Sequence, residues 1–371
     1  MAKRLPSTPP TLSGFSPIRP LGTGGFADVF LYEQNMPRRS VAVKVLLADV
    51  VDEDVIKMFN AEADTMARLS SHPSILTVYE AAIAPDGRPY LVMEYCPRSV
   101  SPAYRREVMP LKDVLDIAVR IGSALETAHR SGVLHRDIKP SNILYTSFGT
   151  PVLADFGIAT SLSGRSGNQT FAMSVPWSAP EVLTYKTKGT VATEVYALGS
   201  TVYSLLAGHS PYEIAGGSNA KEELRKRVLR GRMTPLDRDD VSPDLITILK
   251  QSLSTRPENR QKSALEFAQH IQMVQEAMGF NVTPCDVASE EWAGAGAKLD
   301  FDDSQTRVEG RSTVAYESKR RTRKTTVASL ASERENNELE ASVSKTPSWV
   351  WGALAGAGVV LAVLFGAWMV L

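Results

Sequence analysis

The sequence predicts an α+β protein in which a sheet-rich lobe is followed by a helical lobe, with an apolar helix after them. Three observations support this prediction. Strand-like segments dominate the first 95 residues, helical periodicity dominates from residue 111 to residue 277, and residues 349–371 are 23 consecutive positions without a charge.

The predicted sheet is small and antiparallel. Segments 27–32 and 41–47 are rich in β-branched and apolar residues, and Pro85-Asp86-Gly87 marks a turn between strands at 76–83 and 89–93. A helix over 52–69 interrupts these strands, because its apolar residues recur at helical spacing and its first turn is acidic.

The second half of the folded region reads as helices. Apolar residues form one stripe along 111–128, and further helical patterns cover 194–206, 243–253 and 263–277. A sheet-rich lobe that precedes a helical lobe predicts a cleft between the two. No internal repeat with a period of 20 to 50 residues is visible, which disfavours solenoids and propellers.

Composition limits the classes of function. The 41 basic and 41 acidic residues balance, so no net field favours nucleic acid, and Cys96 and Cys285 are too few for a disulfide framework. Residues 1–13 are predicted to be a disordered start, and 279–348 a flexible linker with few large apolar residues.

Residues 349–371 are predicted to cross a membrane once. Their length exceeds the hydrocarbon core of a bilayer, and Trp349 and Trp368 lie at helix positions suited to its two interfaces. The alternative, a buried helix of a soluble core, rarely lacks a polar face over this length. Because the basic residues precede the span, the residues before it are predicted to be cytoplasmic and the chain to lie in the cell membrane.

The first motif with chemical meaning is Leu21-Gly22-Thr23-Gly24-Gly25-Phe26, which leads into Val29. Glycines let backbone N–H groups approach phosphates closely, and Val29 would cover an adenine ring. The alternative is an ordinary hairpin turn. A dinucleotide-binding fold is disfavoured because a strand, and no helix, follows the glycines.

A lysine inside an apolar strand forms the second motif. Lys44 ends Val41-Ala42-Val43-Lys44, and a buried ammonium group needs an anionic partner. Glu62, 18 residues later on the predicted helix, can supply the carboxylate. Alternatively, Lys44 lies on an edge strand with its amino group in water.

The third motif is His135-Arg136-Asp137-Ile138-Lys139-Pro140-Ser141-Asn142, followed 18 residues after Asp137 by Asp155-Phe156-Gly157. Phosphoryl transfer needs a carboxylate that accepts the proton of the attacking hydroxyl, together with hard oxygen ligands for magnesium. Asp137, Asn142 and Asp155 have the required side chains.

In this order, and followed by Ala179-Pro180-Glu181, the motifs resemble those of the eukaryotic-like (Hanks-type) Ser/Thr protein kinases of bacteria, over residues 14–278. The resemblance implies the two-lobed protein kinase fold and ATP-dependent phosphoryl transfer to Ser or Thr of protein substrates, including autophosphorylation. A pseudokinase scaffold is disfavoured because Lys44, Asp137 and Asp155 are present. A small-molecule phosphotransferase is disfavoured because it would lack Lys139 and the segment that ends at Glu181.

The resemblance also assigns roles to individual residues. Lys44 and Glu62 pair, Asp137 is the catalytic base, Lys139 contacts the γ-phosphate, and Asn142 and Asp155 bind Mg²⁺. ATP is bound by the glycine-rich segment and by the backbone of residues 94–96, so the expected nucleotide-binding residues are Leu21, Gly22, Gly24, Gly25, Val29, Lys44, Glu94 and Cys96, with Met93 as gatekeeper. Glu181 is expected to pair with Arg260.

Regulation by phosphorylation is a further expectation. Arg136 next to the catalytic base is typical of kinases that are activated by a phosphate on the activation segment, and Thr170 is favoured over Ser163 and Ser166. Ser174 is expected to keep a hydroxyl beside the base. Ala27, in place of the third glycine, and Glu194, in place of an aspartate that supports the catalytic loop, depart from the family pattern.

The linker and the span carry weaker predictions. Five basic residues within 319–324 are predicted to contact the lipid bilayer, with phosphorylation of Thr322, Thr325 or Thr326 releasing them; the alternative is a solvated basic stretch. The same threonines, with Thr306 and Thr313, are candidate docking sites for phosphothreonine-binding partners. Gly352 and Gly356 have the spacing of a helix dimer, which predicts a homodimer.

Overall fold

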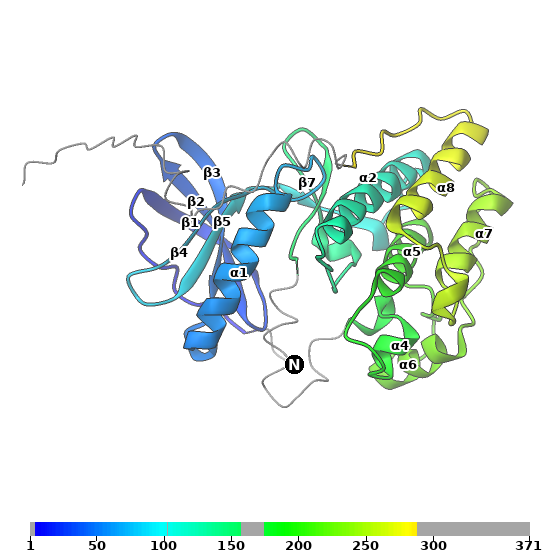
Figure 1. The fold of residues 1–371 in the computed structure, drawn as a ribbon, viewed down its shortest axis with the longest axis horizontal. Coiled ribbons are helices and arrows are strands. Elements are labelled where there is room, and N and C mark those ends of the chain that lie inside the picture. Colours follow the sequence, from blue (N-terminus) through cyan, green and yellow to red (C-terminus); the bar gives the residue numbers. More distant parts are fainter. Residues whose placement is uncertain (1–3, 102, 157–173, 288–371) are drawn as a thin grey trace, which may run out of the picture. The chain divides into compact units, whose positions relative to one another are not determined.

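The computed structural model describes residues 4–101, 103–156 and 174–287, which all belong to one compact unit. Figure 1 shows the predicted α+β arrangement, with a sheet and helix α1 in one lobe and the remaining helices in the other. The strands are β1 (Phe15–Thr23), β2 (Ala27–Asn35), β3 (Arg38–Leu46), β4 (Val78–Ile83), β5 (Pro89–Glu94), β6 (Arg98–Ser99), β7 (Ile143–Tyr145) and β8 (Pro151–Leu153). The helices are α1 (Glu53–Leu69), α2 (Leu111–Arg130), α4 (Pro180–Leu183), α5 (Val191–Ala207), α6 (Lys221–Arg230), α7 (Pro243–Ser252) and α8 (Ala264–Ala277).

The five-stranded sheet has the order β1-β2-β3-β5-β4, and all its neighbouring strands are antiparallel. Its two faces belong to different apolar clusters because successive side chains of a strand point to opposite sides. On β3, Ala42 and Leu46 join one cluster, while the valines at positions 41, 43 and 45 join the other. Lys44 lies on the first face, opposite Val29 of β2 and Leu91 of β5.

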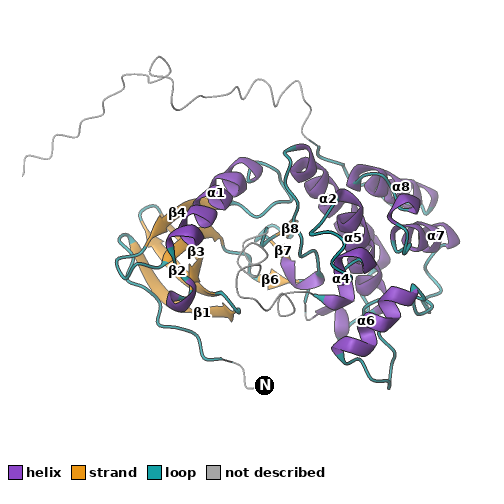
Figure 2. Cartoon of the chain, turned by 60° about the horizontal axis from the view of Figure 1, so that its bottom comes forward, coloured by secondary structure: helices purple, strands orange, loops and turns teal. Residues whose placement is uncertain are grey.

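Helix α1 covers the first face of the sheet, as Figure 2 shows. The carboxylate of Asp52 caps it by accepting a hydrogen bond from the Val55 backbone N–H at 2.8 Å. Val55 and Phe59 of the helix are buried in the same cluster as Leu46. This packing fixes α1 beside the strand that carries Lys44.

Helix α2 lies at the centre of the helical lobe and packs against α5 and α8. Its close contact with α8 depends on Gly122, where a Cβ atom would lie 3.0 Å from Ala268 Cβ and 3.3 Å from the Ala264 carbonyl oxygen. Side chains of Thr190, Ser242 and Ser263 cap the N-termini of α5, α7 and α8. The buried helices therefore pack behind residues 135–142, the predicted catalytic loop.

A small sheet of order β6-β7-β8 lies between the lobes and carries the predicted Mg²⁺ ligands at its ends. Asn142 immediately precedes β7, and Asp155 follows β8 by two residues. Ile75, in the loop between α1 and β4, forms a bridge with Leu153 of β8. The small sheet thus joins the loop after α1 to the helical lobe.

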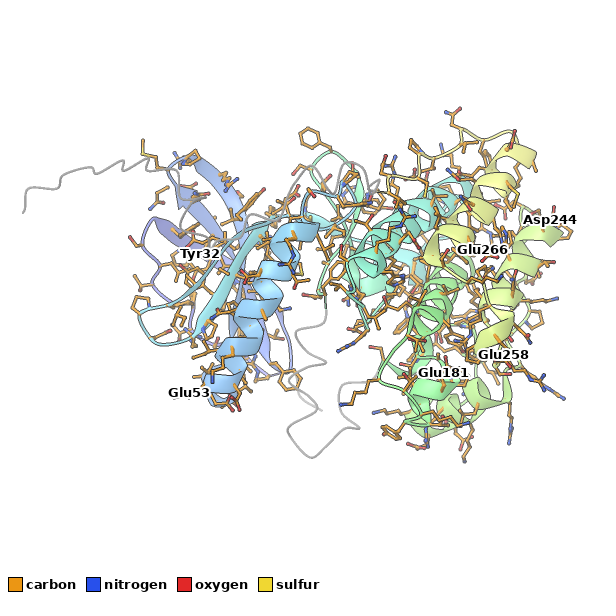
Figure 3. All side chains as sticks on the ribbon, in the orientation of Figure 1. Tyr32, Glu53, Glu181, Asp244, Glu258 and Glu266 are labelled. Atoms are coloured by element: carbon orange, nitrogen blue, oxygen red, sulfur yellow. The ribbon has the colours of Figure 1, made fainter. Side chains whose placement is uncertain are left out.

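The structure differs from the disordered start predicted for residues 1–13. From Arg4 onward this part of the chain follows the second face of the sheet: the hydroxyl of Tyr32, labelled in Figure 3, donates to the Pro10 carbonyl oxygen at 2.7 Å, and Leu12 is buried. Arg88 donates to the Thr8 carbonyl oxygen at 2.9 Å. The three prolines give this segment no regular secondary structure, yet its backbone and Leu12 complete the packing of the sheet.

The structure also differs from the domain end predicted at residue 278. The buried hydroxyl of Thr283 donates to Asp116 and accepts from Gln275, both at 2.9 Å, and His72 contacts the Asp286 carbonyl oxygen at 2.6 Å. Residues 279–287 therefore belong to the folded domain. Among the residues that the structure describes, no helix is long and apolar enough to span a membrane. The rest of the predicted linker and the predicted span at 349–371 lie outside the described residues.

Candidate active site

The turn between β1 and β2 lines one side of a cavity of about 310 Å³. The Gly24 N–H donates to the Ala27 carbonyl oxygen at 2.8 Å, and a Cβ atom on Gly24 would lie only 3.0 Å from that oxygen. A side chain there would crowd the turn, so glycine is required for its shape. The cavity is lined by Gly22, Thr23, Gly24, Gly25, Phe26, Ala27, Val29, Lys44, Leu46, Asp137, Lys139, Asn142 and Asp155.

Three residues expected to bind the nucleotide do not line this cavity. Leu21 and Cys96 pack against the apolar cluster of Leu46 and Met93, and Glu94 ends β5. Burial and the neighbouring Glu94 carboxylate raise the pKa of Cys96 to about 12, which keeps its thiol protonated. Leu21, Glu94 and Cys96 therefore stay predictions as nucleotide contacts.

Lys44 reaches into the cavity from β3 and has a carboxylate partner there. Its Nζ lies 2.7 Å from Oδ1 of Asp155, and its side chain is 14% exposed. The charge of Lys44 is the largest influence on Asp155 and, against burial, holds the pKa of that carboxyl below its ordinary value. Sequence reasoning did not find this contact. Glu62 lies on α1, but its side chain is outside the described residues, so the predicted Lys44–Glu62 pair stays a prediction.

Asp137 is the centre of a hydrogen-bonded group in the catalytic loop. Its Oδ2 accepts from Lys139 Nζ at 2.6 Å, and its Oδ1 accepts from Ser174 Oγ at 2.8 Å. Lys139 Nζ also donates to Ser174 Oγ at 3.1 Å, and Asn142 Nδ2 donates to the Asp137 carbonyl oxygen at 2.8 Å. The hydroxyl of Ser174 therefore lies beside the predicted base, as the sequence predicted.

Glu194 holds the catalytic loop from within the helical lobe. Its buried carboxylate accepts from the backbone N–H groups of His135 at 3.0 Å and Arg136 at 2.5 Å, and contacts His129 Nε2 at 2.9 Å. Burial alone would raise the pKa of Glu194, but hydrogen bonds from His129 and Arg136, with nearby positive charge, lower it below the ordinary value. The departure from aspartate thus keeps a carboxylate in contact with the loop.

Two residues of the site, one before Asp137 and the other Asp155 itself, have left-handed backbone conformations. Arg136 has a φ of 66° and Asp155 a φ of 61°, conformations that cost free energy outside glycine and persist only where surrounding contacts hold them. His135 provides such contacts: Nδ1 accepts from the Asp137 N–H at 3.2 Å, so Nε2 donates to the Ala154 carbonyl oxygen at 2.8 Å. One imidazole therefore links the segments of Asp137 and Asp155.

The expected pair of Glu181 and Arg260 is present, and Figure 3 labels Glu181 on α4. Two hydrogen bonds of 2.6 and 2.9 Å join the groups, and the Arg260 side chain is fully buried. Thr170, Ser163 and Ser166 lie outside the described residues, and Arg136 is exposed. Thr170 therefore stays a prediction as the regulatory residue.

The oxygen atoms of the site suit Mg²⁺. Among the described residues, no group of three or more His, Cys, Asp or Glu side chains is placed to hold a metal. Mg²⁺ often needs only one or two protein oxygens, because waters and phosphate oxygens complete its coordination. Asn142 donates through its Nδ2 atom, while its Oδ1 accepts one long hydrogen bond of 3.4 Å from Ser141 Oγ and keeps a second lone pair for a metal; Asp155 lines the same cavity. Asn142 and Asp155 therefore fit the predicted role.

Comparison with known proteins gives a consistent result. The family model described as protein kinase domain matches residues 15–273. The chain is 35% identical over 283 residues to serine/threonine-protein kinase PknK of Mycobacterium bovis, covering 75% of this chain and 25% of that protein. It is 33% identical over 278 residues to serine/threonine-protein kinase PknB of Mycobacterium leprae, covering 70% and 43%.

A solved structure shares the fold. The PknI kinase domain of Mycobacterium tuberculosis, crystallised as a point mutant, aligns with a TM-score of 0.51 and 28% identity, covering 71% of this chain and 96% of that one. The chain spans a quarter to less than half of the length of the two curated relatives. The cavity, its charged groups and the family match together show that this chain belongs to the protein kinase family.

Proposed function

We propose that the chain is an active Ser/Thr protein kinase that transfers the γ-phosphoryl group of ATP, with Mg²⁺, to hydroxyl groups of protein substrates and of itself. One observation carries this proposal: Lys44, Asp137, Lys139, Asn142 and Asp155 line one cavity under the glycine-rich turn. The names of the relatives, serine/threonine-protein kinases, support the class of acceptor.

Each side chain of the cavity has a separate role in the proposed phosphoryl transfer. Lys44 donates to phosphate oxygens, and its contact with Asp155 places that carboxylate beside the phosphates. Asn142 and Asp155 would hold Mg²⁺, which would supply neutralisation of phosphate charge. Asp137 accepts the proton of the substrate hydroxyl, which takes the position near Oδ1 that Ser174 Oγ now contacts. Lys139, 2.6 Å from Asp137, stabilises negative charge on the transferred group.

Incubation of the purified full chain with radiolabelled ATP and Mg²⁺, together with a general protein substrate, tests the proposal. We expect label on serine or threonine of both the chain and the substrate, and loss of label in Asp137→Asn. Asp244→Asn is the matched control, because Asp244 is an exposed carboxylate of α7, far along the chain from the cavity residues (Figure 3). Nucleotide binding without transfer would indicate a pseudokinase and contradict the proposal.

Membrane anchoring is a second part of the proposal and is supported by sequence alone. Residues 349–371 would form a single-pass helix with the kinase domain in the cytoplasm, the basic residues of 319–324 would contact lipid, and Gly352 and Gly356 would favour a homodimer. Phosphorylated threonines of the linker would bind phosphothreonine-reading partners. Extraction of membranes at alkaline pH distinguishes the cases: an integral protein stays in the pellet, and release into the supernatant would contradict a membrane span.

A further inference from the structure

Residues 4–12, named here the N-terminal segment, contact the strand that leaves the glycine-rich turn. The segment lies along the second face of the sheet and ends at the buried Leu12. Arg88 donates to Ser7 Oγ at 3.2 Å, and the Tyr32 hydroxyl donates to the Pro10 carbonyl oxygen at 2.7 Å. The segment is therefore attached at several points and not only at its end.

Asp28 is the residue that connects the segment to the nucleotide cavity. It lies second in β2, opposite Thr23 of β1, and its neighbours in sequence, Ala27 and Val29, line the cavity. Because side chains alternate along a strand, the carboxylate of Asp28 points to the other face, where it is fully buried. A buried carboxylate is costly unless it is paired and hydrogen-bonded.

The partners described for this carboxylate both come from the N-terminal segment. The Arg4 guanidinium forms an ion pair with it, and the Ser7 backbone N–H donates to Oδ2 at 2.7 Å. These bonds outweigh burial and hold the pKa of Asp28 below its ordinary value. Arg4 also lies 3.4 Å from the Gly24 carbonyl oxygen in the turn itself. The segment thus contacts both the base of the glycine-rich turn and its tip.

We propose that Arg4 and Ser7, acting through Asp28, are positioning residues that set the height of the glycine-rich turn above the bound nucleotide. Gly24 and Gly25 have no side chains that pack against the lobe, so the position of the turn depends on its flanking strands, on the packing and hydrogen bond of Phe26 and on these contacts. Displacement of phosphate-binding N–H groups by about 1 Å is sufficient to weaken productive binding. This inference rests on the proposed function, since the nucleotide is assumed to be ATP.

The competing explanation is that the N-terminal segment only covers apolar surface of the sheet, and it predicts different results. A segment that only covers apolar surface would change the melting temperature and leave nucleotide affinity unchanged. A segment that positions the turn changes the dissociation constant and the KM for ATP, while kcat at saturating ATP and the KM for a peptide substrate stay nearly constant.

The backbone N–H of Ser7 allows a sharp test in the full chain, purified in detergent. Ser7→Pro removes this donor to Asp28. Ser7→Ala keeps the N–H and removes the hydroxyl that Arg88 contacts, so the difference between the two variants isolates the N–H. Arg4→Gln removes the ion pair, and Arg4→Lys keeps the charge. Arg38→Gln, which breaks an exposed pair with Glu33 at the far end of the β2–β3 hairpin, controls for loss of a surface arginine.

We expect Ser7→Pro and Arg4→Gln to raise the dissociation constant of a non-hydrolysable ATP analogue about tenfold, the effect of losing a charge-assisted hydrogen bond. Arg38→Gln should stay within about twofold of the parent, Ser7→Ala should lose less affinity than Ser7→Pro, and Arg4→Lys should recover part of the loss. An affinity within twofold of the parent in both Ser7→Pro and Arg4→Gln would overturn the inference. Binding is measured without turnover, so a parent chain that binds the analogue but transfers no phosphate would contradict the proposed function alone.

Discussion

The catalytic loop and the glycine-rich turn face the same cavity but are held in different ways. The loop is fixed from within the helical lobe, where Glu194 accepts from two of its backbone N–H groups and His135 links it to the segment of Asp155. The turn has one internal hydrogen bond, accepts one from the Leu47 N–H at the Phe26 carbonyl oxygen and packs Phe26 on the sheet, and it is further supported through Asp28 by residues 4–12. Those residues precede the range 15–273 matched by the family model. Family membership therefore accounts for the chemical half of the site, and a segment outside the matched range contacts the glycine-rich turn.

The largest expected effect comes from the catalytic loop. Asp137→Asn removes the proton acceptor and should lower kcat by about 10²- to 10⁴-fold, with little change in ATP affinity because Asp137 lies on the loop side of the cavity. Steady-state phosphate transfer at varied ATP concentration measures both parameters. An equal loss in ATP affinity would show that the two halves of the site are not separable.

The pair of Glu181 and Arg260 tests the rigidity of the helical lobe. Glu181→Gln leaves the buried Arg260 without its anionic partner and should lower the free energy of unfolding by about 3 kcal/mol, measured by denaturant unfolding. Glu222→Gln is the control, since its carboxylate lies 3.8 Å from Arg225 on the surface and contributes less than about 1 kcal/mol. A similar loss of unfolding free energy in both variants would contradict a stabilising role for the buried Glu181–Arg260 pair.

Glu194 offers a more selective change on the loop side. In Glu194→Gln a single acceptor oxygen replaces the two carboxylate oxygens that meet two backbone N–H groups and His129, so kcat should fall about tenfold. Glu194→Asp keeps the charge and should lose less. Retention of full kcat in Glu194→Gln would mean that the loop holds its shape without this carboxylate.

The smallest effect concerns His72, which joins the loop after α1 to residues 279–287. Its Nδ1 accepts from the Ser74 N–H, so the neutral ring donates through Nε2 to the Asp286 carbonyl oxygen. Burial lowers the pKa of His72 from its ordinary value of 6.5. Below pH 6.5 the unfolded chain binds a proton that the folded chain resists, so the free energy of unfolding should decrease as the pH falls from about 7.5 to about 5.5.

A second variant isolates this contribution. His72→Gln should reduce the pH dependence of unfolding over the same interval, as measured by denaturant unfolding at each pH. An unchanged slope in the variant would show that His72 is not the group that titrates.

The order of elements was predictable because their signals are local. β-branched and apolar content predicted β2 and β3, and the turn at Pro85-Asp86-Gly87 predicted β4 and β5. Helical spacing predicted α1, with its acidic first turn, and α8. The charged residues of the cavity were predictable because phosphoryl transfer requires those side chains in that order along the chain. Their shared cavity is the structural result that the motifs implied.

Contacts between distant polar groups were not predictable from local patterns. Pro6, Pro9 and Pro10 indicate disorder by composition, and only the partners Tyr32, Asp28 and Arg88 show that the segment is ordered. The domain end was likewise misplaced at 278, because the bonds of Thr283 to Gln275 and Asp116 depend on tertiary structure. Asp28, an acidic residue within a strand beside the glycine-rich turn, was the available signal for the ordered N-terminal segment, because a carboxylate in that position needs a partner.

One pair of measurements tests the contrast between the two halves most directly: KM for ATP and kcat, determined in parallel for Arg4→Gln and Glu194→Gln. Each variant is predicted to change a different parameter. Arg4→Gln should raise KM for ATP at nearly constant kcat, and Glu194→Gln should lower kcat at nearly constant KM. Changes in the same parameter for both variants would contradict the separate support of the turn and the loop.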